Sequence, residues 1–291
     1  MSSYIDHTMW SDPGRHKSNL MELPNSPVDL SDGLEEFLIH HVVAGYIGFG
    51  VPDYAESDRN LRTVSRILST ISERDSRPLS KQRELPNYFY GTCHDFSLMA
   101  VSAFRTRGVE ARLRAGFVDY LIPGHWEDHW LCEYSVNGSW QLFDPQLGNR
   151  ARESLGIDFD VGDVPRSRFK TAGMLWLALR NGGIDPKICG VSFAGIRGEW
   201  FPATSVLRDA AALAQIETLP WDFWGPARDI ALTETVSNRI SEKVDALALA
   251  TIEKAETLES AATIYDQFPW AKPGETVLSF VASKLQEVSI F

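Results

Sequence analysis

An Asn-Gly pair at positions 137 and 138 separates two short runs in which apolar and polar residues alternate. The runs cover residues 128–134 and 139–144, and such alternation is the pattern of a half-buried strand. Asn-Gly suits a two-residue hairpin turn, because both turn positions require a positive φ. The sequence therefore predicts a β-hairpin, which would hold residues from its two strands side by side.

A cysteine, Cys93, opens an apolar run upstream of this hairpin. The run repeats at helical spacing through Phe96, Leu98, Met99, Val101 and Phe104. We therefore expect the sulfur of Cys93 at a helix N-terminus, where the helix dipole favours a thiolate. The competing interpretation is a buried core cysteine, since most free cysteines are packing residues.

Cys93, His129 in the first hairpin strand and Asp144 at the end of the second follow one another as a nucleophilic triad would. In that reading Cys93 attacks a carbonyl, His129 keeps the thiol ionised and later protonates the leaving group, and Asp144 orients the imidazole. Each partner has a structural alternative. His129 would otherwise be a hydrogen-bonded strand residue, and Asp144 a residue of the turn before Pro145.

Two other histidines compete for the role of base. His94 follows Cys93 directly and would point to another face of the helix, whereas His125 lies in a predicted mobile loop and is the reserve candidate. A zinc site built from His125, His129, Cys132 and Cys93 is a further reading. Strand alternation argues against it, because it sends Cys132 to the face opposite His129.

The developing oxyanion of an acyl intermediate also needs hydrogen-bond donors. The backbone N–H of Cys93 is the natural first donor. Gln82, Asn87 and Tyr90 lie shortly upstream and are the candidates for the second, with no pattern that selects one of them.

Several separated motifs occur in a family order: Gly-x-Cys at 91–93, residues 107–112 with Gly116-Phe117, His-x-x-x-Glu-Tyr at 129–134 and Trp-x-x-x-Asp-Pro at 140–145. Over residues 85–148 the chain resembles the catalytic core of the transglutaminase-like superfamily, in a bacterial uncharacterised or biosynthetic branch. The resemblance implies a papain-like fold with Cys93, His129 and Asp144 as triad. The sequence departs from the family's common pattern at His94 and Trp130, which concerns substrate preference. No acidic loop has calcium-ligand spacing, so calcium dependence is not carried over.

The order of helices first and strands second favours an α+β fold. We expect a papain/transglutaminase-like core with N-terminal helices, a catalytic helix, an antiparallel sheet and a helical C-terminal extension. The predicted parts are an irregular N-terminal arm (1–29), the catalytic core (30–150) and a mostly helical C-terminal region packed on the core (151–291). Predicted helices cover 32–44, 58–73, 166–181, 203–216, 230–258 and 274–288.

Charge and cysteine content exclude several classes of function. The net charge is −11 with a pI of about 5.1, and basic residues form no cluster, so neither nucleic acid nor membrane is an expected partner. The apolar stretches are short and the N-terminus is polar, so we expect a cytoplasmic protein. The three cysteines, Cys93, Cys132 and Cys189, make a poor disulfide framework. No cofactor or metal is expected.

These observations predict cysteine-dependent acyl transfer or amide-bond chemistry through a Cys93 thioester. Water as acceptor would give an amidase, and an amine acceptor would give an amide synthase or transglutaminase. The expected substrate is a small-molecule or peptide amide or thioester, with an amine acceptor or a carrier protein as further partners. A catalytically inactive binding module of the same fold and a zinc-binding protein are the alternatives.

Overall fold

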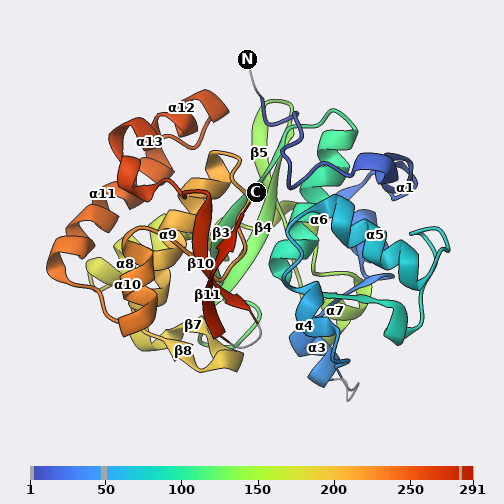
Figure 1. Cartoon of the computed structure of the whole chain (residues 1–291), viewed down its shortest axis with the longest axis horizontal. Helices are drawn as coiled ribbons and strands as arrows, with labels where there is room; N and C mark the ends of the chain where they lie inside the picture. The colour runs from blue at the N-terminus through green and yellow to red at the C-terminus, as the bar shows by residue number, and fades with distance from the viewer. Residues whose placement is uncertain (1–2, 47–50, 282–283, 291) are drawn as a thin grey trace. The chain divides into compact units, whose positions relative to one another are not determined.

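The computed structural model describes residues 3–46, 51–281 and 284–290, which form two compact units (Figure 1). The N-terminal unit comprises Ser3–Leu113 and Leu131–Pro165. The C-terminal unit comprises Arg114–Trp130 and Arg166–Phe291. Two long strands, β3 (Ala111–Val118) and β4 (Trp126–Val136), each run from one unit into the other.

The N-terminal unit is built from short helices around two long ones, with small pieces of sheet. Its elements are α1 (Lys17–Met21), α2 (Pro27–Leu34), β1 (Leu38–His40), α3 (His41–Tyr46), α4 (Ala55–Asp58), α5 (Val64–Arg74), β2 (Phe89–Gly91), α6 (Cys93–Thr106), β5 (Ser139–Phe143) and α7 (Asn149–Leu155). Strands β1 and β2 pair in parallel. The C-terminal part of β4 pairs with β5 in antiparallel register.

The longest helix of this unit, α6, begins at Cys93 as its apolar pattern predicts. All its residues from Cys93 to Arg105 are buried, so α6 runs through the interior of the unit. Helix α5 contributes four buried side chains at helical spacing to the same unit, Val64, Ile67, Leu68 and Ile71. The buried helix fixes the position of its first residue, which the fold cannot shift without repacking the interior.

The predicted hairpin is confirmed. Asn137 and Gly138 have φ values of 51° and 78°, so both turn residues occupy the left-handed region that this turn requires. The register pairs Cys132 with Phe143, one residue before Asp144. The turn chemistry and the alternation therefore predicted these strands correctly.

Two predictions for the N-terminal region are wrong. The first 29 residues are not an irregular arm, since they contain α1 and the start of α2, and Tyr4 and Trp10 are buried. The helix predicted over 32–44 is divided into α2, β1 and α3. The N-cap of α2 is Ser26, whose side chain accepts a hydrogen bond from the Asp29 N–H. Pro27 suits the first helical position of α2.

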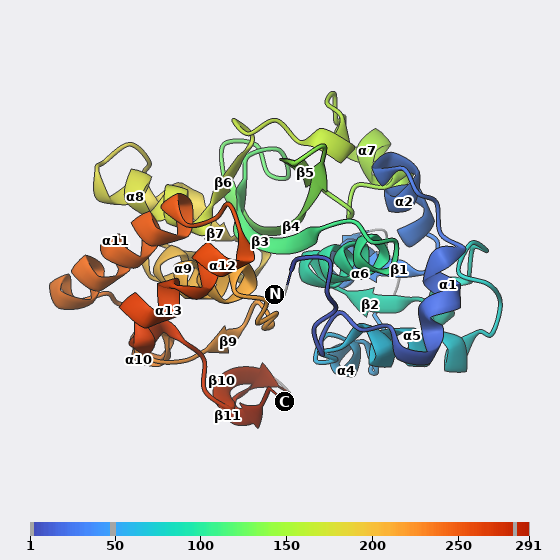
Figure 2. The same ribbon diagram turned by 90° about the horizontal axis from the view of Figure 1, so that it is seen from above.

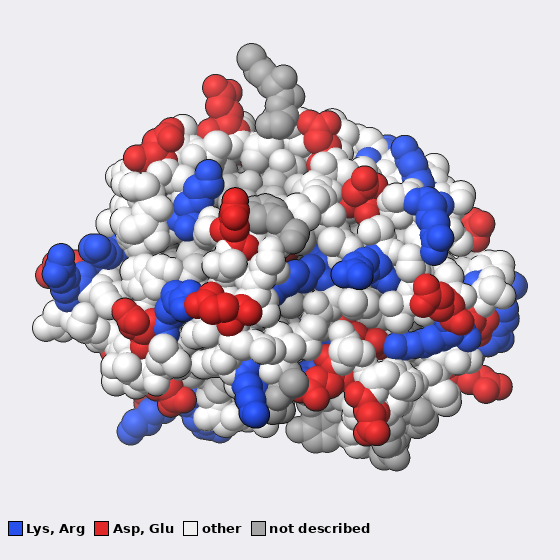
Figure 3. Space-filling model, in the orientation of Figure 1, with Lys and Arg blue, Asp and Glu red and all other residues white. Residues whose placement is uncertain are grey.

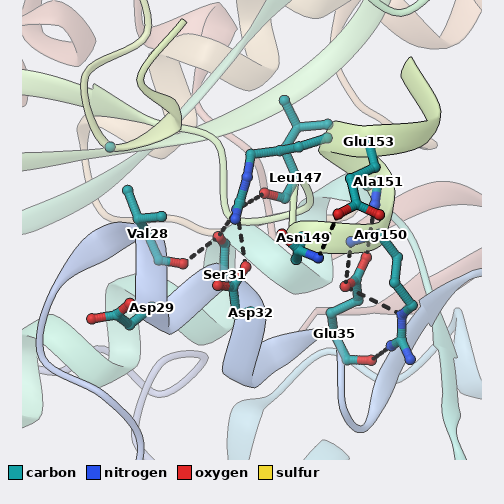
Figure 4. A network of polar contacts seen from close by, with 12 residues as sticks. Val28, Asp29, Ser31, Asp32, Glu35, Leu147, Asn149, Arg150, Ala151 and Glu153 are labelled. Atoms are coloured by element: carbon teal, nitrogen blue, oxygen red, sulfur yellow. Dashed lines mark hydrogen bonds and ion pairs between the residues drawn. The ribbon is translucent and has the colours of Figure 1, made fainter. Parts of the chain in front are cut away.

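Helix α7 is fastened to α2 by polar contacts (Figure 4). The carboxylate of Glu35 accepts hydrogen bonds from the backbone N–H groups of Arg150 and Ala151, both 3.0 Å away. It therefore satisfies two of the unpaired donors at the α7 N-terminus. Nη1 of Arg152 lies 2.9 Å from Oδ1 of Asp32 in an ion pair, and it donates a hydrogen bond to the Leu147 carbonyl, also at 2.9 Å.

The C-terminal unit contains helices and the greater part of a sheet whose strand order is β6-β3-β4-β7-β8. Its further elements are β6 (Phe169–Thr171), α8 (Ala172–Arg180), β7 (Cys189–Val191), β8 (Ile196–Arg197), α9 (Trp200–Leu213), β9 (Asp222–Phe223), α10 (Pro226–Thr233), α11 (Asn238–Glu253), α12 (Leu258–Ala262), α13 (Ile264–Gln267), β10 (Thr276–Val281) and β11 (Lys284–Ser289). Helices α8, α9 and α11 lie side by side (Figures 1 and 2).

Helix α9 is anchored to β3 by a buried ion pair. Arg114 donates two hydrogen bonds to the Asp209 carboxylate, each 2.9 Å long, and the Ala115 N–H adds a third at 3.1 Å. Both charged side chains are almost fully buried. The bidentate geometry compensates for the loss of water around each charge, so this pair fixes the helix on the strand.

Two further predictions, both for the C-terminal unit, are wrong. The segment predicted as a helix over 274–288 forms the hairpin strands β10 and β11 instead. Within β10, Val277 is buried, whereas Thr276 and Phe280 are exposed, and β-branched and aromatic residues favour a strand. The main sheet is also not purely antiparallel, since β4 and β7 pair in parallel.

The fold class is confirmed as α+β, with an α-helix before the main antiparallel strands. The two units cut across the predicted ranges 30–150 and 151–291, because residues 114–130 group with the C-terminal residues. Those domain boundaries stay a prediction. On the face shown in Figure 3, acidic and basic side chains are interspersed. Within the described residues, we find no helix with the length and apolar character of a membrane span.

Candidate active site

The start of α6 holds Cys93 in a locally closed network. Thr92 is extended (φ −130°, ψ 177°) and serves as N-cap. Its backbone N–H donates to Oδ2 of Asp95 at 2.7 Å, and its hydroxyl donates to the same oxygen at 3.1 Å. The cap therefore keeps Cys93 as the first helical residue, next to the unpaired N–H groups of the first turn.

Gly91 is required by this network. A β-carbon at position 91 would lie 2.9 Å from both Cβ and Oδ2 of Asp95, which is closer than real side chains approach. A larger residue would push Asp95 away from Thr92. The Gly-Thr-Cys sequence thus reflects a steric and a hydrogen-bonding condition of the same helix start.

The sulfur-bearing residue is close to the surface without being open to it. Cys93 is 7% exposed, whereas the next residues of α6 are fully enclosed. The helix dipole and the first-turn N–H groups direct positive potential towards this position. The carboxylate of Asp95 opposes part of that potential, because it lies within the same turn.

Asp144 is buried directly after β5. Its backbone N–H donates to the Val161 carbonyl at 2.9 Å, and its Oδ1 accepts a hydrogen bond from the Gln146 N–H at 3.1 Å. The second contact is the turn interaction expected of an aspartate before a proline. It also fixes the orientation of the carboxylate, so the structural interpretation and the triad interpretation are compatible.

His129 lies in the middle of β4. It is 1% exposed, and its ring meets Tyr120 edge to face at 6.3 Å between centroids. His129 belongs to the C-terminal unit, whereas Cys93 and Asp144 belong to the N-terminal unit. The grouping of all three side chains into a triad stays a prediction.

Comparison with known families agrees with this arrangement of motifs. Residues 55–145, just under a third of the chain, match the family model of the transglutaminase-like superfamily. This segment is similar to the transglutaminase-like core. The matched range contains Cys93, His129 and Asp144. Neither the search of curated proteins nor the search of solved structures gave a match.

The similarity to this superfamily indicates a general class of chemistry. Proteins of the transglutaminase-like superfamily generally carry out cysteine-based acyl transfer or amide chemistry. The match identifies neither a substrate nor a reaction. Those finer properties depend on the residues around the core.

The two histidines that compete with His129 have different surroundings. His125 is buried, and its Nε2 lies 3.3 Å from Oε2 of Glu127. Glu127 in turn accepts hydrogen bonds from the Ser192 N–H. Burial lowers the pKa of His125 and raises that of Glu127. His125 thus lies beside a carboxyl group of the same strand region. His94 is fully buried within α6, with its Nδ1 3.9 Å from Oδ1 of Asp95.

The candidates for a second oxyanion donor are reduced by one. The hydroxyl of Tyr90 donates to the Leu85 carbonyl at 2.9 Å, so its proton is already engaged. Burial raises the pKa of Tyr90 to about 12. Asn87 ends a short 3₁₀ helix (Leu85–Asn87), and Gln82 lines a cavity described below. Neither is selected over the other.

Sequence reasoning missed His41 beside the segment that leads into α6. Its Nδ1 lies 3.3 Å from the carbonyl oxygen of Gly91, two residues before Cys93. Burial lowers the pKa of His41 to about 4, so the ring is neutral at pH 7 and Nδ1 carries the proton in this contact. The ring of His40 stacks on it at 4.9 Å. No pattern connects residues so far apart in sequence.

A second unpredicted feature is the charged pair formed by Asp128, the partly exposed residue before His129, and the buried Arg208. Burial raises the pKa of Asp128 to about 7, although the buried guanidinium of Arg208 opposes the shift. Burial lowers the pKa of Arg208 to about 10. Arg208 donates to Ser205 at 2.8 Å and lies over the rings of Phe201 and Phe223. Desolvation therefore raises the pKa of the residue next to the proposed base towards neutral pH.

Metal binding finds no geometric support in the described part of the chain. Within it, no group of three or more histidine, cysteine and acidic side chains is arranged to hold a metal ion. β4 is a continuous strand, so His129 and Cys132 point to opposite faces, as the alternation predicts. Two of the four residues of the suggested zinc site, His129 and Cys132, therefore lie on opposite faces of the same strand.

Proposed function

We propose that the protein is a cysteine-dependent acyl-transfer or amide enzyme. The Cys93 thiolate attacks the carbonyl of an amide, ester or thioester, the bond to the leaving group breaks, and a thioester forms on Sγ. The proton of the thiol passes through His129 to the leaving group. Water or an amine then attacks the thioester and releases the thiol. The superfamily match over residues 55–145 supports this class of reaction.

One observation carries the proposal: Cys93 is the first residue of a long buried helix whose start is fixed by Thr92 and Asp95. A core cysteine would gain nothing from that position, because its packing does not depend on the helix terminus. A nucleophile gains from it, since the helix N-terminus stabilises the thiolate and its N–H groups suit a developing oxyanion.

The roles of His129 and Asp144 are proposed from the hairpin. His129 and Leu131 share one face of β4, because side chains alternate along a strand. Phe143 pairs with Cys132, so Asp144 falls next in register, opposite Leu131. Asp144 would then orient the imidazole of His129, and the imidazole would accept the proton of Cys93.

The expected substrate is a small-molecule or peptide amide or thioester. The acceptor is either water or an amine, and a carrier protein is the expected source of a thioester donor. An amine acceptor added in competition with water would distinguish the two reactions, because only a transferase converts it into a new amide.

The decisive experiment measures alkylation of Cys93 by iodoacetamide as a function of pH, with peptide mapping by mass spectrometry. We expect fast reaction at about pH 6, well below the usual thiol pKa of about 8.5. The chain holds its own reference, because burial raises the pKa of Cys189 to about 12 and its Sγ contacts the Pro186 carbonyl. Equal, slow reaction of Cys93 and Cys189 would contradict the proposal.

A variant tests the same chemistry with a substrate. Cys93→Ala should abolish thioester formation from p-nitrophenyl acetate while leaving the thermal unfolding midpoint nearly unchanged, since loss of one sulfur leaves little empty space. The measurement is intact-mass detection of the acetylated protein. Cys132→Ala is the control and should still be acetylated. Acetylation that persists in Cys93→Ala would exclude Cys93 as the nucleophile.

A further inference from the structure

The N-terminal unit contains a cavity of about 570 Å³. This volume lies within the range of small-molecule sites. Its wall is formed by residues of β1, α3, α6, α7 and the segment before β2. Two of its aliphatic residues, Val43 and Leu155, are each 43% exposed and mark an opening to solvent. An apolar recess that opens at the surface is suited to a ligand rather than to the protein's own core.

The wall of this cavity is mainly aliphatic and aromatic, with Leu38, Leu85, Tyr88, Phe96 and Leu147 among its residues. Apolar surface of this kind gains free energy when an apolar group displaces water from it. The cavity therefore favours a hydrocarbon group.

The charged residues of the wall have partners in the protein. Glu35 binds the start of α7 and lies 3.2 Å from Nε of Arg150 (Figure 4). The guanidinium of Arg83 donates to backbone carbonyls, including that of Arg77 at 2.7 Å. These charged groups already interact with the protein. They would therefore offset little of the free energy that is lost when a charged ligand group is desolvated in the cavity.

The cavity begins one helical turn from the proposed nucleophile. Phe96 lies three residues after Cys93 in α6, and side chains at that spacing are neighbours on the helix surface. Helical side chains also lean towards the N-terminus, so Phe96 leans towards the turn that starts with Cys93. The wall further contains Gln146, whose N–H donates to Asp144.

We infer that this cavity receives the aliphatic acyl part of the donor whose carbonyl reacts with Cys93. The inference rests on the proposed function and adds the substrate class: an ester, thioester or amide of a medium-length aliphatic acid. The acyl chain would lie along Phe96 in the cavity, with its carbonyl at the start of α6. In the step itself, the bond from Sγ to the carbonyl carbon forms, and the leaving group departs with the thiol proton.

The hydrolysis product offers a direct binding probe. Decanoate carries a nine-carbon alkyl chain for the cavity and a carboxylate for the N-terminus of α6, where negative charge is favoured. Isothermal titration calorimetry should show decanoate binding to the wild-type protein. Acetate, which has the same carboxylate and no chain, should bind at least tenfold more weakly.

Filling the cavity should remove this binding. Ala151 and Ser154 line the cavity from α7 without occupying it, and neither is fully buried. Ala151→Phe and Ser154→Phe should each weaken decanoate binding at least tenfold. The matched control is Ala178→Phe, a change of the same size on the partly exposed side of α8, which should bind decanoate as the wild type does.

Acylation provides the second readout. p-Nitrophenyl decanoate should acylate Cys93 of the wild type faster than p-nitrophenyl acetate does, and Ala151→Phe should slow only the decanoate reaction, by at least tenfold. Circular dichroism establishes whether each variant is folded. If one of the two cavity-filling variants does not fold, the other still provides the test.

The two readouts separate the inference from the proposed function. Absent decanoate binding, or equal binding by the filled and control variants, would overturn the cavity as the acyl site even if Cys93 is acetylated. Decanoate binding that is lost on filling, together with a Cys93 that no ester acylates, would overturn the acyl-donor assignment by removing the chemistry itself.

Discussion

The start of α6 and the middle of β4 supply the two central residues of the proposed mechanism, and they are stabilised in different ways. At α6 the N–H and hydroxyl of Thr92 both bind Asp95, three residues away. At β4 the neighbours of His129 are carboxyl groups whose pKa values are raised by burial, to about 7 for Asp128. The first region is held by local hydrogen bonds, and the second depends on distant charges.

The difference follows from how each region is surrounded. A helix start can satisfy its own polar groups from the residues of its first turn. A central strand cannot, because its side chains project into neighbouring layers. Asp128 meets the charge of Arg208 from α9, and Glu127 accepts from Ser192 beyond β7. The environment of the nucleophile is therefore local, whereas that of the proposed base is assembled from remote elements.

The largest expected effect concerns Asp144, which is proposed to connect these two regions by orienting His129. Asp144→Asn should lower the rate of Cys93 acetylation by p-nitrophenyl acetate about 10²- to 10⁴-fold, because the amide stabilises the wrong imidazole tautomer. Its Oδ atom can still accept from Gln146, so the fold should persist. Stopped-flow release of nitrophenolate measures the rate.

The control for this variant is Asp158→Asn, an exposed carboxylate of the same unit, which should leave the rate within twofold of wild type. A loss smaller than about threefold in Asp144→Asn, with a normal unfolding midpoint, would remove Asp144 from the triad.

The next effect tests Asp128, the carboxyl group that precedes His129 in β4. The folded-state pKa of Asp128, about 7, exceeds its ordinary value of 3.8, so the folded protein holds this proton more tightly than the unfolded chain. Its contribution to stability is present at low pH and is lost as pH rises towards and through 7. Relative to wild type, Asp128→Asn should gain roughly 1 to 3 kcal/mol of unfolding free energy between pH 5 and pH 8.

Urea denaturation at both pH values measures this gain. Asp229→Asn, an exposed carboxylate of α10, is the control and should show no such gain. A difference between Asp128→Asn and wild type that is the same at pH 5 and pH 8 would mean that Asp128 titrates as an ordinary surface carboxylate.

The parts of the molecule that sequence predicts well are those governed by local chemistry. The Asn137-Gly138 turn, its two strands and the start of α6 at Cys93 follow from turn residues, alternation and helical spacing. The superfamily resemblance is confirmed over residues 55–145, and the motif residues Cys93 and Asp144 are both buried.

The parts that sequence does not predict depend on contacts between distant segments. His41 reaches the Gly91 carbonyl across fifty residues, and Arg208 faces Asp128 across eighty. The apolar run of 32–44 is compatible with one helix, but the chain forms β1 there because it pairs with β2. Residues 276–281 and 284–289 likewise form strands, because β10 pairs with β9 as well as with β11.

The smallest expected effect tests how local the first region is. Asp95→Asn keeps an oxygen that accepts from Thr92 and removes a negative charge from the first turn of α6. Because that charge opposes the helix dipole at Cys93, its removal should stabilise the thiolate and move the midpoint of iodoacetamide alkylation to lower pH by a few tenths of a unit. The unfolding free energy should fall by about 1 kcal/mol or less.

Asp29→Asn is the matched control, since Asp29 occupies the same third helical position of α2, where Ser26 is the cap. It should leave the alkylation midpoint of Cys93 unchanged. A midpoint that moves to higher pH in Asp95→Asn would show that Asp95 supports the thiolate through another group, the neighbouring His94 being 3.9 Å from its carboxylate. The start of α6 would then depend on a charged partner, as the middle of β4 does.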